Sequence, residues 1–167
     1  LIVDPVMIAT SGDQLLADDA IDAMKTRIIP RAEIITPNLA EAARLLDEAP
    51  AADVEGMIVQ AKTLKGLGCG AVLVKGGHST MGDAVDVLFD GSDVTTFSKP
   101  RVDTRNTHGT GCTLSAAIAA NRALGMALPP AVEAAKHYVW EAIVAAKDLH
   151  LGQGHGPLDH LYRMRTS

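Results

Sequence analysis

Short apolar runs alternate with helical patterns along the chain, and this alternation constrains the fold more than any other feature. We expect strands at residues 1–3, 33–36 and 71–75. Apolar residues recur at helical spacing in residues 15–28, 38–46 and 53–67. Short apolar strands that alternate with helices predict an α/β fold with a mostly parallel central sheet flanked by helices.

The spacing of the apolar residues changes after the third predicted strand. Residues 84–89 and 94–98 flank the sequence Asp-Gly-Ser, which predicts a β-hairpin with glycine in the turn. We expect an alanine-rich helix at residues 112–124, a break at Pro129-Pro130, a long helix to residue 149 and a short helix at residues 158–164. Pro30 is expected to end the first helix in the same way.

Composition narrows the class of protein. The chain has 167 residues, 47% of them hydrophobic, which is enough to fill the core of one domain. Its net charge of −5 disfavours a sequence-independent nucleic-acid binder, which needs a basic surface. No apolar run is long enough to span a membrane, and Cys69 and Cys112 form no CxxC pair. We therefore expect a cytoplasmic protein without nucleic-acid or membrane partners.

The first residues suggest a longer protein. The chain begins with Leu1, not methionine, and its first strand reads as one that is buried on both faces with neighbours on both sides. We expect the chain to be the C-terminal part of a longer one.

The strongest local motif is residues 106–113, Asn-Thr-His-Gly-Thr-Gly-Cys-Thr, directly before a predicted helix. Glycines allow a tight turn, and the first N–H groups of a helix attract a phosphate. The motif lacks the lysine of a Walker A loop, and a tight turn that merely starts a helix is the alternative. Cys112 falls in the first helical turn, where the helix dipole stabilises a thiolate, although free cysteines are usually small buried apolar residues.

Other polar residues follow the predicted strands. Asn38 and Glu41 have the spacing of a helix capping box, and an Asn and a Glu at a strand end could also hold hydrated Mg²⁺. Asp4 ends the first strand and either starts a turn or faces a ligand. Lys75 ends the third strand, as a phosphate ligand or as a solvated lysine. The histidines of the tail, at residues 150, 155 and 160, lack a ligand set for structural zinc.

The order of four motifs resembles the hydroxymethylpyrimidine/phosphomethylpyrimidine kinases of thiamine biosynthesis, in the ribokinase superfamily. These motifs are Val-Asp-Pro-Val-Met at residues 3–7, Thr-Pro-Asn-Leu-Ala-Glu-Ala at 36–42, Val-Lys-Gly-Gly-His at 74–78 and Thr-His-Gly-Thr-Gly-Cys-Thr-Leu-Ser-Ala at 107–116. Gly-His-Gly-Pro-Leu-Asp-His at residues 154–160 also resembles the family's ending.

The resemblance implies two successive phosphorylations by ATP, first of 4-amino-5-hydroxymethyl-2-methylpyrimidine and then of its monophosphate. Gly109, Thr110, Gly111 and Cys112 would form the anion hole, with the Cys112 thiolate as base where most of the superfamily has Asp. Asp4 and Glu41 match positions of the Mg²⁺–water network, and Lys75 and Thr107 match positions near the ATP phosphates. We also expect Asn38, like Lys75 and Thr107, to be a cofactor-binding residue.

The resemblance also implies limits. Residues 1–167 would be the C-terminal, ATP-side part of one ribokinase-like domain, with the N-terminal half and its pyrimidine pocket absent, so we expect no turnover by this chain alone. Family members are commonly homodimers. The alternatives are a pyridoxal kinase, which usually carries Asp at the position of Cys112, and a non-catalytic module that binds a nucleotide or a pyrimidine.

Overall fold

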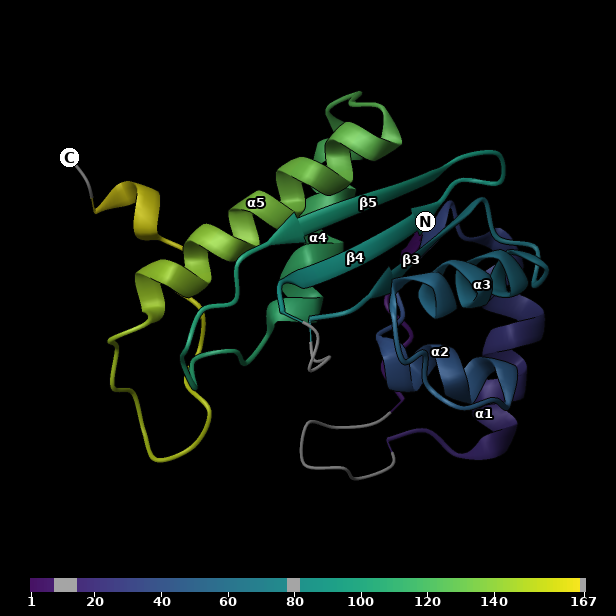
Figure 1. Ribbon diagram of the computed structural model, residues 1–167, viewed down its shortest axis with the longest axis horizontal. Coiled ribbons are helices and arrows are strands. Elements are labelled where there is room, and N and C mark those ends of the chain that lie inside the picture. The colour runs from purple at the N-terminus through teal and green to yellow at the C-terminus, as the bar shows by residue number, and fades with distance from the viewer. Residues whose placement is uncertain (8–14, 78–81, 166–167) are drawn as a thin grey trace. The chain divides into compact units, whose positions relative to one another are not determined.

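A computed structural model describes residues 1–7, 15–77 and 82–165 (Figure 1). The chain divides into two compact units, residues 1–98 and residues 99–167, and each is described by itself. His78 of the third motif lies outside the described residues.

The first unit is built on a sheet whose strands follow one another in chain order. The strands are β1 (Ile2–Val3), β2 (Ile34–Ile35), β3 (Ala71–Lys75), β4 (Ala84–Phe89) and β5 (Val94–Lys99). β1, β2 and β3 are parallel, and β4 runs antiparallel to β3. The predicted mostly parallel sheet, with a hairpin at its end, is confirmed.

The register aligns the carboxyl ends of the parallel strands. Val3 pairs with Ile35, and Ile35 pairs with Val72. An isolated parallel bridge between Asn38 and Lys75 extends this pairing beyond the end of β2. The polar residues that follow the strands are therefore brought to one edge of the sheet.

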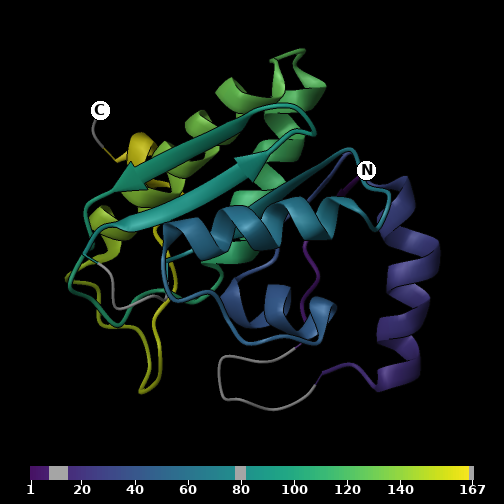
Figure 2. The same cartoon turned by 45° about the vertical axis from the view of Figure 1, so that its right-hand side comes forward.

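Helices α1 (Asp18–Ala23), α2 (Leu39–Leu46) and α3 (Val54–Lys65) belong to the same unit (Figure 2). The helix predicted at residues 15–28 differs in detail, because it begins at Asp18, widens to a π-helical turn over Met24–Ile28 and ends in a 3₁₀ turn, Ile29–Arg31. Pro30 lies inside that 3₁₀ turn, near its start, where a missing N–H costs little.

The core of the first unit lies between these helices and one face of the sheet. Its buried members include Ile21, Ile35, Ala42, Leu45, Met57, Ala61, Leu64, Val72, Val74 and Val87. β1 differs from its prediction, since Ile2 and Val3 are only half-buried. The reason is its place in the sheet: among the described residues no strand pairs with it on the side away from β2.

The second unit contains α4 (Thr110–Ala123), α5 (Leu128–Ala146) and a 3₁₀ turn at Tyr162–Met164. α4 and α5 pack along each other (Figure 1), and α5 buries Ala131, Val132, Ala135, Val139, Ala142 and Ala146. The predicted proline break is the start of α5, because proline fits the first helical turn. Of the short helix predicted at residues 158–164, only the 3₁₀ turn forms.

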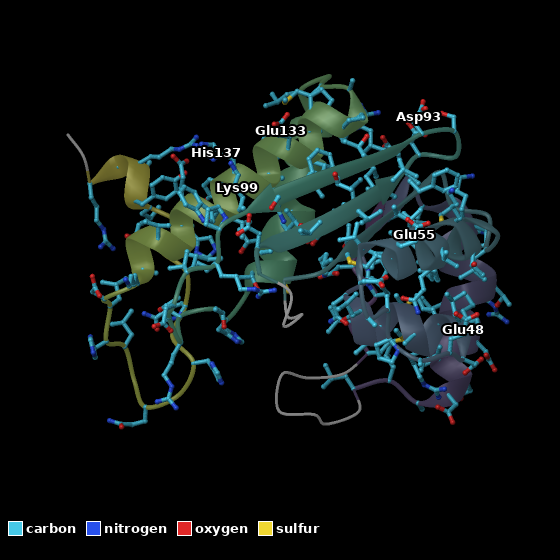
Figure 3. The ribbon with its side chains drawn as sticks, viewed as in Figure 1. Glu48, Glu55, Asp93, Lys99, Glu133 and His137 are labelled. Carbon is cyan, nitrogen blue, oxygen red and sulfur yellow. The ribbon has the colours of Figure 1, made fainter. Side chains whose placement is uncertain are left out.

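The outer side of α5 carries polar contacts. Lys99, the last residue of β5, lies beside His137 (Figure 3), with Nζ 3.2 Å from Nδ1. Lys99 also lies over the ring of Trp140, at 5.6 Å from its centre. Within the described part of the chain, no helix is both long and apolar enough to cross a membrane.

Candidate functional site

Three polar side chains meet at the carboxyl edge of the sheet in the first unit. Lys75 Nζ lies 2.6 Å from Asp4 Oδ1, and the Thr36 hydroxyl donates to the same oxygen at 2.9 Å. The side chains of Lys75 and Asp4 are only 13% and 12% exposed, so Lys75 is not a solvated lysine at a strand end. An ion pair this sheltered from solvent is held in one arrangement by the strands on either side of it.

Asn38 and Glu41 form the predicted capping box at the start of α2. The Glu41 N–H donates to Asn38 Oδ1 at 2.9 Å, and the Asn38 N–H donates to Glu41 Oε2 at 2.7 Å. The structural interpretation of this pair is confirmed, because each side chain satisfies a backbone N–H that the helix leaves unpaired. Glu41 is nevertheless only 3% exposed, which is unusual for a capping glutamate.

Burial sets the electrostatics of Glu41. Desolvation raises the pKa of this carboxyl above its usual value, while the bond from Asn38 and the charge of Lys75 pull it down and the charge of Asp4 pushes it up. A cation placed beside Glu41 and Asp4 would relieve both the desolvation and the repulsion.

The free oxygens of these carboxylates fit a hydrated divalent cation. Asp4 Oδ1 and Glu41 Oε2 are occupied by protein donors, whereas Asp4 Oδ2 and Glu41 Oε1 have no hydrogen-bonding partner among the described residues. Mg²⁺ prefers carboxylate oxygens and keeps several waters, so two carboxylate oxygens without a protein donor are candidate ligands for it. Among the described residues, no group of three or more His, Cys, Asp or Glu side chains is placed to hold a metal ion, so the protein would supply only part of the coordination shell.

The second unit holds the glycine loop. Gly109 stands at the N-cap of α4 with a φ of +86°, a left-handed conformation that favours glycine. The Thr113 N–H donates to the Gly109 carbonyl at 2.9 Å, which closes the first turn. In the described chain, the N–H groups of Gly111 and Cys112 have no backbone acceptor. The loop therefore presents unpaired donors at the positive end of a helix of 14 residues, as an anion requires.

Cys112 is exposed in the first turn of α4, whereas Cys69 is buried in the core of the first unit. The alternative for Cys112, a small buried apolar residue, is wrong. Burial raises the pKa of the Cys69 thiol, and its Sγ lies 3.9 Å from the Leu64 carbonyl oxygen, so this cysteine has a packing role in the core.

Thr107 and Thr110 shape the turn that leads into α4. The Thr110 hydroxyl donates to the Thr107 carbonyl at 3.1 Å, and Thr107 itself is half-buried. This hydrogen bond holds the two threonines together at the base of the loop. The structure thus groups Thr107, Thr110, Gly111 and Cys112 in the second unit, and Asp4, Asn38, Glu41 and Lys75 in the first.

Two supporting residues, Thr36 and Asn106, were not predicted from the sequence. Thr36 is completely buried, and its hydroxyl donates a hydrogen bond to Asp4. Its position directly after an apolar strand is the feature of the sequence from which a site role could have been predicted. Asn106 is buried beside the glycine loop, and its Nδ2 donates to the carbonyls of Ala146 and Leu149 at 2.6 and 2.7 Å. Nothing in the sequence pairs Asn106 with the end of α5, so that contact could not be predicted.

Comparisons with known proteins agree with the resemblance seen in the motifs. The family model for phosphomethylpyrimidine kinase matches residues 1–159. A hydroxymethylpyrimidine/phosphomethylpyrimidine kinase of Rhizobium meliloti is 51% identical over 162 residues, which cover 97% of this chain and 61% of the relative. The chain thus spans about three-fifths of the length of that relative.

Solved structures share the fold. An ADP complex of Bacillus subtilis pyridoxal kinase superposes with a TM-score of 0.88 at 35% identity, covering 98% of this chain and 61% of that one. A phosphomethylpyrimidine kinase of Clostridium difficile gives a TM-score of 0.73 at 38% identity, covering 86% of this chain and 57% of that one. The expected ribokinase-like fold is confirmed, and the chain belongs to the phosphomethylpyrimidine kinase family.

Proposed function

We propose that residues 1–167 are part of one ribokinase-like kinase domain that transfers the γ-phosphoryl group of ATP to hydroxymethylpyrimidine and then to its monophosphate. The observation that carries this proposal is the start of α4, where Gly109 turns the chain and the N–H groups of Gly111 and Cys112 are unpaired. The family match, which extends across both units, supports the substrate class.

The glycine loop supplies electrostatic stabilisation in this proposal. Phosphoryl transfer spreads negative charge over the transferred group, and donors already in position need no reorganisation to receive it. The Gly111 and Cys112 N–H groups are held by the first turn of α4, so they would bind the phosphoryl oxygens without moving. A Cβ built at Gly109 would meet no described atom within 4 Å, so the space beside this glycine is open.

Cys112 is the proposed base. Its sulfur would accept the proton of the substrate hydroxyl as the hydroxyl oxygen attacks the γ-phosphorus of ATP and ADP leaves. Its exposure in the first turn leaves the sulfur accessible to a substrate. Because the metal and the N–H donors carry most of the acceleration in such reactions, a base of modest strength is sufficient.

In the first unit, Asp4 and Glu41 would hold Mg²⁺ through water, and the bound ion would neutralise phosphate charge. Lys75 is kept by Asp4 at a strand end, where its ammonium group could bind a phosphate oxygen as well. Asn38 and Thr107 would contribute polar contacts to the nucleotide phosphates. The capping role of Asn38 is compatible with this, since its Nδ2 is not used by the capping box.

A pyridoxal kinase is the second candidate. The close fold of the Bacillus subtilis pyridoxal kinase favours it, whereas Cys112 in place of Asp favours the pyrimidine. A non-catalytic binding module is less well supported, because Asp4, Glu41, Lys75 and the glycine loop are all present. From the family we also infer that the protein is cytoplasmic and that it forms a homodimer. Light scattering in solution would test the dimer.

Calorimetric titration with MgATP tests the proposal. We expect the chain to bind MgATP at one site, and to form no pyrimidine phosphate by itself. Lys75→Met should weaken binding by about tenfold, since a charge-assisted hydrogen bond contributes on the order of 1.5–3 kcal/mol. Lys62→Met, an exposed lysine of α3, is the matched control and should bind as the wild type does. Absence of MgATP binding by the wild-type chain would contradict the proposal.

A further inference from the structure

The histidine-containing tail lies against the glycine loop in the second unit. The His108 N–H donates to the Gly156 carbonyl at 3.1 Å, and a parallel bridge joins His108 to Pro157. His155 Nδ1 lies 3.3 Å from the Arg105 carbonyl oxygen. Residues 155–157 thus line one side of residues 105–108, and the packing is tight, because a Cβ at Gly156 would collide with the Asn106 side chain.

One tail residue reaches the first turn of α4 itself. His160 Nε2 lies 2.9 Å from Thr113 Oγ1. The same hydroxyl lies 2.7 Å from the Gly109 carbonyl oxygen, to which it donates its hydrogen. A threonine hydroxyl has a single proton. While the Thr113 hydroxyl donates to the Gly109 carbonyl, His160 can bond it only by donating from Nε2–H, so this relay pairs with the Nε2–H tautomer of the imidazole.

The backbone of His160 is anchored separately. The Tyr138 hydroxyl of α5 donates to the His160 carbonyl at 3.1 Å, and the Asp159 N–H donates to the Ala142 carbonyl at 3.2 Å. Asp159 is buried and also pairs with Arg165 at 3.3 Å. The imidazole is thereby held from α5 while its Nε2–H points at α4.

We propose that His160 is a positioning residue for the glycine loop, acting through Thr113 on the Gly109 carbonyl. The Gly109 carbonyl accepts from both the backbone N–H and the hydroxyl of Thr113. His160 supports the bond from the Thr113 hydroxyl to the Gly109 carbonyl. That bond orients the Gly109–Thr110 peptide, and the peptide in turn sets the direction of the unpaired N–H groups that follow it. This inference rests on the proposed role of the loop in binding phosphate.

Binding of MgATP to the full 167-residue chain tests the relay. His160→Leu should weaken binding by about three- to tenfold, the effect of one lost hydrogen bond on loop geometry. His160→Gln, whose amide nitrogen can donate in place of Nε2, should restore affinity to within about twofold. His150→Leu is the matched control and should leave affinity unchanged, because among the described residues the His150 side chain hydrogen-bonds only to the nearby Asp148 carbonyl.

Dependence on Thr113 separates positioning from a general loss of structure. In a Thr113→Val background, which removes the hydroxyl, His160→Leu should have no further effect on affinity. Equal affinity of the wild type and His160→Leu, or an undiminished effect of His160→Leu in the Thr113→Val background, would overturn the inference. If the wild-type chain fails to bind MgATP, the proposed function is overturned and this inference falls with it.

A measurement on the wild-type chain tests the relay even if a variant fails to fold. Nitrogen-15 NMR of labelled histidine reports which ring nitrogen carries the proton. The proposed relay requires a proton on Nε2 of His160 in the wild-type chain. A neutral ring with its proton on Nδ1 alone would overturn the relay even if MgATP binds.

Discussion

The two cysteines show how local environment gives one residue type two roles. Cys69 is packed in the core of the first unit, where burial raises the pKa of its thiol, and Cys112 is exposed at the start of α4. Spacing in the sequence left the role of Cys112 open, because a helix-start position is compatible with a buried or an exposed side chain. Exposure, which the structure supplies, decides against the packing role.

This contrast predicts selective alkylation. Iodoacetamide should modify Cys112 in the folded chain and leave Cys69 unmodified, because only exposed thiolates react. Saturating MgATP should slow modification of Cys112 by about fivefold or more if the phosphates bind at the start of α4. Mass spectrometry of tryptic peptides measures both sites, and Cys112→Ser is the control that should remove all labelling. Unchanged labelling of Cys112 in saturating MgATP would contradict binding at this loop.

At the scale of elements, local signals predicted boundaries well where a cap or a turn marks them. The capping box at Asn38 and the whole of β3 form as expected. Prediction failed where tertiary packing decides the backbone, as in the π-helical turn at Met24–Ile28. It also could not reveal that the tail at Gly156 meets the loop at His108, since contacts between distant residues leave no periodic signal.

The cap of α2 predicts a defined change in stability. Asn38→Ala removes the side-chain acceptor for the Glu41 N–H and should lower the free energy of unfolding by about 1 kcal/mol. Asn38→Asp keeps an acceptor and should retain most of that stability. Urea denaturation followed by circular dichroism measures both variants. An Asn38→Ala protein as stable as the wild type would show that the capping box is not stabilising.

At the scale of the whole molecule, the burial of Glu41 links folding to pH. Below about pH 4.5, the usual pKa of the group, Glu41 is protonated in the folded and unfolded chains alike. As the pH rises through the raised pKa, the unfolded chain ionises more readily than the folded one, so this group lowers the free energy of unfolding.

We expect the free energy of unfolding to fall as the pH rises from about 4.5 towards neutral, relative to Glu41→Gln, which keeps an acceptor for the Asn38 N–H but does not titrate. Urea denaturation across this range measures it. Mg²⁺ should oppose the loss in the wild type alone, because a bound cation favours the ionised carboxylate. Parallel pH profiles for the two proteins would contradict the link.

The sequence motifs led to the family and to the correct sheet, but not to the contacts that hold the site residues. Asp4 follows β1 and Lys75 ends β3, and both places are visible in the sequence. The bonds that Lys75 and Thr36 make to one oxygen of Asp4 depend instead on the register of three strands. Such a register becomes visible only in the folded chain.

The most direct test of the central claim is an NMR titration of the nitrogen-15-labelled chain with MgATP. The account predicts that the amide signals of Gly109, Gly111 and Cys112 shift in a saturable manner, and that Lys75→Met weakens the binding. Binding that leaves these amide signals unchanged, or no binding at all, would contradict the claim that the start of α4 holds a phosphate.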